Sequence, residues 1–110
     1  MITDTVSIEK IKETIIPILR NYPVRKAIIF GSYAKGNASE NSDIDLYIDT
    51  NGKLKGLDFV GLLEILSDSL VKDIDLIDKA HIEPDSLMTK EIENEGTIIY
   101  EKSQDYSKDN

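Results

Sequence analysis

Apolar residues recur every three or four positions in two segments, which is the spacing of an amphipathic helix. The first segment runs from about Ser7 to Asn21, where Ser7 is a candidate N-cap and Pro23 follows the end. The second segment runs over 57–70, and we expect one of its faces to be buried. The residues expected on that face are Leu57, Val60, Leu63 and either Ile65 or Leu66.

Alternating or continuous apolar runs predict four strands, over 24–30, 43–49, 73–77 and 97–101. Between them, 32–35 suits one helical turn, 36–42 suits a loop and Asn51-Gly52 suits a turn. Pro84 suits the first turn of a last helix that reaches about Glu95, and Gly96 suits its end. Because helices and strands alternate around one sheet layer, we expect an α+β fold with a small mixed sheet flanked by helices.

The length of 110 residues suits a single domain, which we place at 1–101, followed by a polar tail at 102–110. Since the chain has no cysteine, disulfides and thiolate metal sites are excluded. No secretory signal is evident, and no apolar run approaches the roughly 18 residues of a membrane span. We therefore expect a cytoplasmic protein without a membrane segment.

The charge balance narrows the choice of ligands, because 21 Asp and Glu outnumber 13 Lys and Arg and give a net charge of -8. Extended nucleic-acid binding requires many Lys and Arg against the phosphates, so it is disfavoured. A nucleoside triphosphate remains compatible with an acidic chain when a divalent cation lies between carboxylate and phosphate.

The strand at 43–49 places two carboxylates on one face. Asp43 and Asp45 are two residues apart, so they project from the same side, separated by roughly 6.6–7 Å of rise. Two like charges in that arrangement are unfavourable unless a cation joins them. Magnesium is the natural candidate, because it prefers carboxylate oxygens together with substrate phosphates.

A third carboxylate comes from the strand at 73–77. If this strand lies beside the first acidic strand, Asp75 joins the pair, and three carboxylates then suit a two-metal site for phosphoryl displacement. Asp73 shares the face of Asp75 in a regular strand and remains an alternative, whereas Asp78 falls on the opposite face and is the third choice.

A phosphate cradle is expected where the strand at 24–30 ends. Gly31 followed by Ser32 at the start of a helical turn exposes backbone N–H groups and a hydroxyl. Lys35 lies one turn further on, within reach of the same phosphates. Tyr33 is expected to pack at the rim of this cleft, and Tyr47, on the aspartate face, either lines the pocket or lies exposed. His81 is expected to be a surface loop residue.

These segments together resemble a known family. The run GSYAKG at 31–36, a short spacer and SDIDL at 42–46 are similar to the motifs of minimal nucleotidyltransferases of the DNA polymerase beta superfamily. The later IDLID and ENEGTIIYE segments also look like that group, so the resemblance spans roughly 8–101. It implies the palm-like nucleotidyltransferase fold.

The resemblance also implies roles for individual residues. Gly31 and Ser32, with Lys35 and Ser42, would bind the triphosphate of ATP. The three aspartates would be the catalytic residues and would hold magnesium, with two ions expected. They are Asp43, Asp45 and, nearest the attacking hydroxyl, Asp75.

Family members of this size are similar to antitoxins that accompany helical HEPN toxins, and some transfer AMP from ATP to a tyrosine of that partner. The resemblance therefore implies an antitoxin with a HEPN-type partner, and it allows a hetero-oligomer of the two. A chain this short leaves no room for a separate acceptor-binding domain, so we expect the acceptor from outside. Neutralisation by binding alone and transfer to a small molecule remain alternatives, and a template-directed polymerase is disfavoured.

Overall fold

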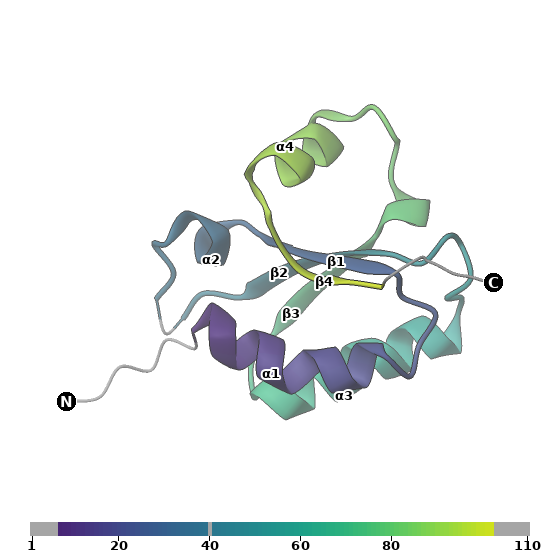
Figure 1. Cartoon of the computed structure of the whole chain (residues 1–110), viewed down its shortest axis with the longest axis horizontal. Coiled ribbons are helices and arrows are strands. Elements are labelled where there is room, and N and C mark those ends of the chain that lie inside the picture. Colours follow the sequence, from purple (N-terminus) through teal and green to yellow (C-terminus); the bar gives the residue numbers. More distant parts are fainter. Residues whose placement is uncertain (1–6, 40, 103–110) are drawn as a thin grey trace.

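A computed structural model of the chain describes residues 7–39 and 41–102. The predicted tail therefore lies outside the described residues, except for its first residue, Lys102. The elements in chain order are α1 (Ile8–Leu19), β1 (Lys26–Phe30), α2 (Ser32–Lys35), β2 (Ile44–Asp49), α3 (Leu57–Leu70), β3 (Ile74–Asp78), the 3₁₀ turn η1 (Lys79–His81), α4 (Leu87–Glu95) and β4 (Thr97–Glu101) (Figure 1).

The four strands form one mixed sheet in the order β3-β2-β1-β4. Strand β1 pairs antiparallel with both β2 and β4, whereas β2 and β3 run parallel. Strand β3 lies at one edge of this sheet, beside the acidic strand β2. The predicted α+β class with a small mixed sheet is confirmed.

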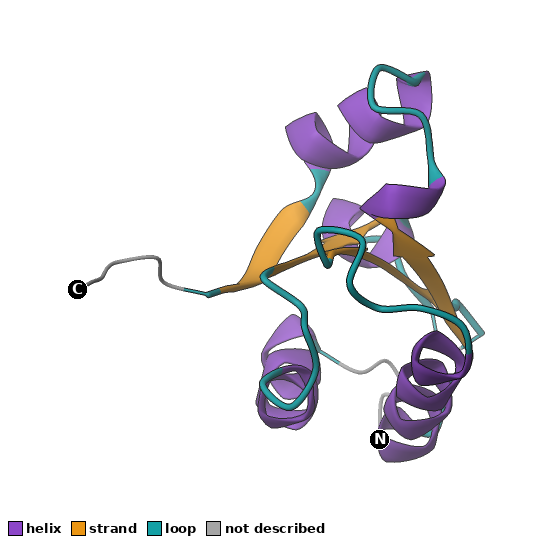
Figure 2. Ribbon diagram, turned by 90° about the vertical axis from the view of Figure 1, so that its right-hand side faces the viewer, coloured by secondary structure: helices purple, strands orange, loops and turns teal. Residues whose placement is uncertain are grey.

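Helices cover the two faces of the sheet unequally. Helices α1 and α3 lie side by side against one face, and α4 stands alone over part of the other (Figures 1 and 2). The larger core fills the two-helix side, and its fully buried members include Ile11, Ile15, Leu19, Ile29, Ile44, Leu46, Ile48, Leu62 and Leu66. The α4 side holds a smaller cluster of Ile28, Tyr47 and Ile92. Part of the α4 face therefore remains free to hold a site.

The ends of the first helix follow the sequence closely. Ser7 caps α1, since its hydroxyl accepts a hydrogen bond of 3.1 Å from the backbone N–H of Lys10. The end of the chain's last helix is also as predicted, because Gly96 is the C-cap of α4. Its φ of -77° shows that the glycine is not needed for a left-handed turn. A Cβ there would instead overlap the Ile28 side chain and the carbonyl oxygen of Ile92.

Two details of the helix predictions were wrong. In α3 the buried residues are Leu62, Leu66 and Leu70, so Leu66 was predicted correctly, and Leu63 packs half-buried against the core. Leu57 and Val60 were wrong, because they are 88% and 47% exposed. Apolar residues occur around most of this helix, so the periodicity did not select one face. Helix α4 begins at Leu87, after the N-cap Ser86, rather than at Pro84. The Ser86 hydroxyl accepts a hydrogen bond from the N–H of Thr89, which fixes that start.

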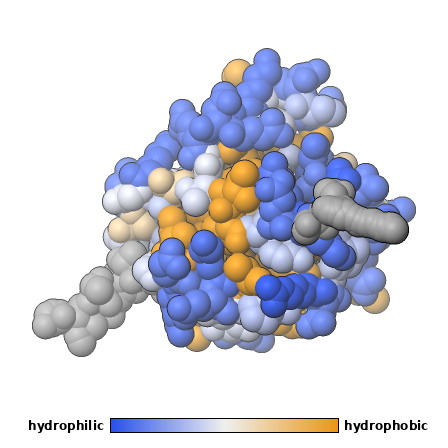
Figure 3. Space-filling view, viewed as in Figure 1, coloured by the Kyte–Doolittle hydropathy of each residue, from blue (hydrophilic) through white to orange (hydrophobic). Residues whose placement is uncertain are grey.

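Within the described residues, no helix combines the length and the apolar character that crossing a membrane requires. Some apolar side chains nevertheless reach the surface, and on one face of the molecule they form a patch. This patch lies in the middle of the face shown in Figure 3, between α1 and α4.

Candidate active site

Asp45 and Asp75 lie directly beside each other on the two parallel strands. Asp45 is the second residue of β2 and Asp75 the second residue of β3, and the register of the sheet pairs the two. Adjacent strands are roughly 4.8 Å apart, so the two carboxyl groups meet on the α4 side of the sheet. The structure therefore joins two of the three predicted catalytic carboxylates.

The electrostatics of Asp45 show that this pair is under strain from like charge. Burial, a hydrogen bond with Asp75 and the negative charges of Asp75 and Asp43 together raise the pKa of Asp45 from 3.8 to about 6. Two carboxyl groups this close resist ionising together, because each places negative charge beside the other. A cation at this position would remove the same repulsion.

Asp43, the third predicted carboxylate, lies directly before β2 in the chain. It is exposed and acts on Asp45 through its charge. Asp43 thus adds negative charge to Asp45, but in the described part of the chain the three predicted aspartates do not form a closed metal-binding group.

The Gly31 turn packs directly against Asp45. Gly31 follows β1, whose last residue, Phe30, is the register partner of Asp45. A Cβ on Gly31 would overlap the Oδ2 atom of Asp45, and the φ of +73° lies in the left-handed region. Glycine is therefore required here twice, once for the backbone angle and once for the close approach. The turn brings the start of α2 to the carboxylate pair.

The other residues predicted to bind nucleotide surround this turn. Ser32 opens α2 and is half-buried, and the first hydrogen bond of the helix runs from the Lys35 N–H to the Gly31 carbonyl at 3.0 Å. The amides before Lys35 have no acceptor within the helix, so they are available to an anion. The Lys35 ammonium is exposed and lies 3.9 Å from a carboxylate oxygen of Glu91 on α4.

Ser42 has a structural task in the loop before β2. Its hydroxyl accepts a hydrogen bond of 2.9 Å from the N–H of Ser39, and its own N–H donates to the Ser39 carbonyl at 3.0 Å. These bonds close the loop that delivers Asp43 and β2 to the site. The predicted contact between Ser42 and nucleotide stays a prediction.

The two alternatives to Asp75 occupy different places. Asp73 precedes β3 and is exposed, and its carbonyl oxygen accepts a hydrogen bond from the Ile44 N–H. Asp78 is 1% exposed and accepts hydrogen bonds from the Thr50 hydroxyl at 2.8 Å and the Ala80 N–H at 3.0 Å. The geometry favours Asp75, because it alone of the three faces Asp45 in the register of the sheet.

The resemblance implies magnesium, which prefers carboxylate oxygens as protein ligands. Among residues 7–39 and 41–102, no group of three or more His, Cys, Asp or Glu side chains is arranged to hold a metal ion. The adjacent pair Asp45 and Asp75 nevertheless fits a divalent cation, since two neighbouring carboxylates repel each other unless positive charge lies between them. Magnesium completes its shell with substrate phosphates and water, so two protein carboxylates suffice.

Comparison with known proteins decides the family. The sequence profile described as Polymerase beta, Nucleotidyltransferase matches residues 13–105. The chain belongs to this nucleotidyltransferase family. It is therefore an enzyme that uses a nucleoside triphosphate, and the family recognised from the GSYAKG and SDIDL segments is confirmed.

Relatives of this nucleotidyltransferase are protein adenylyltransferases and antitoxins. A candidate protein adenylyltransferase of Methanocaldococcus jannaschii is 39% identical over 93 residues, which are 84% of this chain and 98% of the relative. A crystal structure of a toxin–antitoxin complex with AMP-PNP matches with a TM-score of 0.72 and 25% identity, over 84% of this chain and 74% of the other.

A further solved structure is the tri-AMPylated HEPN toxin of Shewanella oneidensis in complex with an MNT antitoxin. It matches with a TM-score of 0.66 over 84% of this chain and 71% of the other. At 21% identity, this likeness shows a shared fold.

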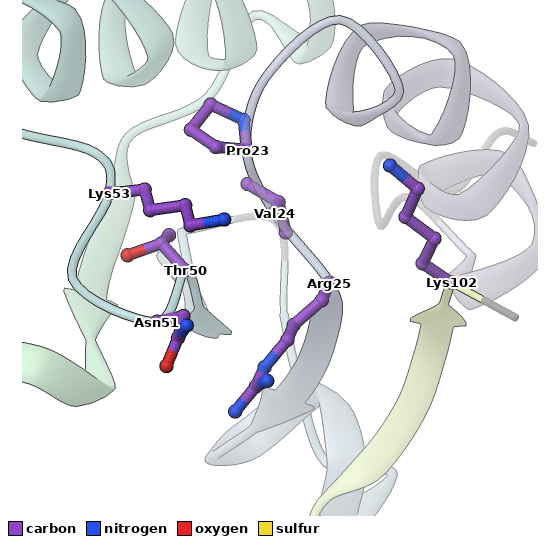
Figure 4. Close-up of a pocket in the computed structure, with 7 residues that line it drawn as sticks. All are labelled: Pro23, Val24, Arg25, Thr50, Asn51, Lys53 and Lys102. Carbon is purple, nitrogen blue, oxygen red and sulfur yellow. The ribbon is translucent and has the colours of Figure 1, made fainter. Parts of the chain in front are cut away.

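One hollow of the nucleotidyltransferase surface lies apart from the carboxylate pair. This hollow of about 370 Å³ is lined by Arg25, Thr50, Asn51, Lys53 and Lys102, among others. Its three cationic side chains point in different directions (Figure 4), and Arg25 is already paired with Asp49. Positive charge is thus not focused at one point, and none of the predicted site residues lines this hollow.

Both tyrosines near the site are more buried than the sequence suggested. Tyr33 is 5% exposed and belongs to the core under α1 and α3, so the prediction of a rim position was wrong. Tyr47 is 2% exposed beneath α4, and burial followed by the charges of Glu93, Asp49 and Asp78 raises its pKa to about 12. His81 is exposed on η1, as expected, with its ring 5.5 Å from that of Phe59.

Proposed function

We propose that this nucleotidyltransferase transfers AMP from ATP to a tyrosine hydroxyl of a HEPN-type toxin and thereby acts as its antitoxin. The observation that supports nucleotidyl transfer most directly is the Asp45–Asp75 pair with the Gly31 turn packed against it. The relatives support the choice of AMP and of a protein acceptor, because one is a candidate protein adenylyltransferase and others are antitoxins in complex with toxins.

In this proposal, one group of residues binds the triphosphate and another binds the metal ions. The Gly31-Ser32 turn binds the triphosphate through backbone N–H groups and the hydroxyl, and Lys35 neutralises part of its charge. Asp43, Asp45 and Asp75 hold the divalent cations, for which we propose two magnesium ions. When bound, magnesium supplies electrostatic stabilisation of the negative charge that develops on the phosphoryl oxygens.

The transfer itself makes one bond and breaks one. The acceptor oxygen bonds to the α-phosphorus of ATP, the bond from that phosphorus to the bridging oxygen breaks, and pyrophosphate leaves. Asp75 accepts the hydroxyl proton. It is suited to this task because it is exposed at the edge strand, where an acceptor can approach, and lies beside Asp45.

The partner protein would cover the side of the active site that the domain leaves open, next to β3. The carboxylate pair lies on the α4 face, and β3 beside it is an edge strand of the sheet that the described residues form. A helical protein placed at that edge would close the site around the nucleotide and present its tyrosine to Asp75.

The test is transfer of label to the product of the adjacent gene. The purified domain is incubated with labelled ATP, magnesium and that protein, and label and intact mass are then followed. We expect a mass increase of one or more AMP units on the partner, and its loss in Asp45→Asn, whose fold is checked by circular dichroism. A stable complex without any transfer would contradict the proposal and favour neutralisation by binding alone.

A further inference from the structure

One ion pair joins α2, which follows the Gly31 turn, to helix α4. The Nζ atom of Lys35, the last residue of α2, lies 3.9 Å from a carboxylate oxygen of Glu91, in the middle of α4. The two side chains are 51% and 62% exposed, so water reaches both. The proposed function uses the same Lys35 ammonium for the triphosphate, and the two uses concern a single positive charge.

The backbone of Lys35 is held in place while its side chain is not. The Lys35 N–H donates a hydrogen bond of 3.0 Å to the Gly31 carbonyl, and Gly36 ends α2 with a left-handed φ of 80°. Beyond this fixed backbone, a lysine side chain is a flexible four-carbon stem that ends in a compact charge. The ammonium is therefore able to move between Glu91 and an anion at the Gly31 turn while α2 stays in place.

The cations at the start of β1 lie far from the Gly31 turn. Arg25 precedes β1 and Gly31 follows it, so about 20 Å of strand separates the two. The Arg25 guanidinium and the Lys79 ammonium lie 3.2 Å and 3.9 Å from the Asp49 carboxylate at that distant end. An anion at the Gly31 turn therefore depends on Lys35 rather than on these side chains.

The position of Glu91 follows from the way α4 packs on the sheet. Ile92 is 1% exposed and packs with Ile28 and Tyr47, which fixes the rotation of the helix about its axis. Glu91, one residue earlier, then points to the side of α4 where Lys35 lies. Glu95 is four residues further on, so it shares that side of the helix. It is exposed and forms no ion pair within the described residues.

A triphosphate and Glu91 compete for Lys35, because both are anions and the ammonium carries one charge. Divalent cations would offset the negative charges of the aspartates on β2 and β3. Glu91, in contrast, forms its ion pair in the described part of the chain with Lys35 alone. A phosphate that takes the ammonium leaves the Glu91 carboxylate unpaired beside it. The negative charge of Glu91 therefore opposes binding of the triphosphate.

We propose that Glu91 sets the affinity for the nucleotide: its carboxylate competes with the triphosphate for the Lys35 ammonium and so weakens nucleotide binding. Glu91 acts through Lys35, which makes it a positioning residue rather than a catalytic one. This inference rests on the proposed function, since it requires that Lys35 meets the triphosphate.

The experiment removes one negative charge from α4 at two matched positions. Calorimetric titration with magnesium and a non-hydrolysable ATP analogue should show binding about two- to fivefold tighter for Glu91→Gln, as expected for an exposed ion pair. Glu95→Gln makes the same change one turn further along the same side and should bind as the unaltered protein does. Unchanged or weaker binding by Glu91→Gln, or an equal gain in Glu95→Gln, would overturn the proposal.

A double-mutant cycle tests whether Glu91 acts through Lys35. Lys35→Met should weaken binding of the analogue, and adding Glu91→Gln to Lys35→Met should have no further effect. A gain of full size without the lysine would contradict the proposed route.

Ionic strength gives a readout that a purely structural role of Glu91 would not move. The advantage of Glu91→Gln should shrink between about 0.1 M and 1 M salt, because the Debye length falls from about 10 Å to 3 Å. A gain that persists unchanged in high salt would point to altered packing of α4 and would overturn the proposal.

Binding and transfer are measured separately, so the failures of the two proposals are distinguishable. Equal affinity of Glu91→Gln and the unaltered protein, with AMP transfer by the latter, would refute the role of Glu91 and leave the function standing. Tighter binding by Glu91→Gln, with no AMP transfer by the unaltered protein, would refute the function and leave the role of Glu91 standing. Absence of analogue binding to the unaltered protein would refute both.

Discussion

Strands β2 and β3 carry aspartates near both ends. The groups that surround these aspartates differ between the two ends of the strand pair. At one end Asp45 faces Asp75, no Lys or Arg of the described residues forms an ion pair with either, and the pKa of Asp45 is raised to about 6. At the other end Asp49 lies 3.2 Å from the Arg25 guanidinium and 3.9 Å from the Lys79 ammonium. Asp78, nearby, accepts hydrogen bonds from a hydroxyl and a backbone N–H.

The difference separates a structural carboxylate from a functional one. Asp49 and Asp78 are buried, yet each has donors or cations that satisfy it, so they stabilise the junction of β2, β3 and η1. Asp45 and Asp75 leave their charge uncompensated by the protein, which is unfavourable for folding and suited to binding a cation with a triphosphate. The identity of the residues is the same, and the surrounding donors decide the role.

The largest expected effect distinguishes Asp75 from Asp73. Asp75→Asn removes the proposed proton acceptor beside Asp45, so AMP transfer should fall by about 10²–10⁴-fold. Asp73→Asn is the matched control, with the same change two residues earlier, and should stay within a few-fold of the unaltered rate. Initial rates of label transfer measure both, and a greater loss in Asp73→Asn would move the third carboxylate to that position.

The second prediction concerns the end of the strand pair where Asp49 and Asp78 have cations or hydrogen-bond donors beside them. Asp78→Ala removes two hydrogen bonds and leaves the buried Thr50 hydroxyl without its acceptor, so the free energy of unfolding should fall by about 2–4 kcal/mol. Urea unfolding followed by circular dichroism measures the change. If Asp78→Ala were as stable as the unaltered protein but inactive, Asp78 would belong to the functional end instead.

A third prediction tests the contact that links the Gly31 turn to Asp45. Gly31→Ala forces a side chain into the left-handed region and against the Asp45 carboxylate, which should cost about 1–2 kcal/mol of folding free energy. Transfer should also fall, because Asp45 must move. Gly52→Ala is a control for the backbone angle, since Gly52 has a φ of +74° and open space around it. Normal transfer by Gly31→Ala would show that the close approach has no part in the site.

The smallest expected effect is the pH dependence of stability without divalent cations. The folded state holds the Asp45 proton more tightly than the unfolded state, since its pKa is about 6 instead of 3.8. Stability should therefore decline as the pH rises from about 4 to 6, and level off above that range. Asp45→Asn should lack this part of the decline, so chemical unfolding at pH 4 and pH 7 compares the two proteins. Parallel profiles for both would show that Asp45 carries no such penalty.

The sequence predicted those parts of the molecule that local signals determine. Ser7 supplies a cap hydroxyl at the start of an apolar periodicity, and α1 begins there. The acid–aliphatic alternation around Asp45 and Asp75 predicted two strands, and the structure has them. The glycine between β1 and α2 was likewise recognisable from its position between a strand and a serine.

Other features depend on contacts between distant segments. Asp75 was chosen with Asp73 left as an alternative on the same face, and only the parallel pairing with β2 shows that Asp75 lies opposite Asp45. The buried face of α3 was mispredicted because apolar residues on its outer side, such as Leu57, satisfy the same spacing as its core residues. The left-handed backbone of Val71 at the end of α3 was likewise not predicted, since glycine or asparagine is the usual residue in that conformation.

The central claim is that the uncompensated pair of Asp45 and Asp75 is where a divalent cation and a triphosphate bind. The most direct measurement is the thermal midpoint with and without magnesium and a non-hydrolysable ATP analogue, which requires no partner protein. A ligand bound to the folded state raises the midpoint. The account predicts a rise for the unaltered protein and for Asp73→Asn, and its loss in Asp45→Asn. An equal rise in Asp45→Asn would contradict the account.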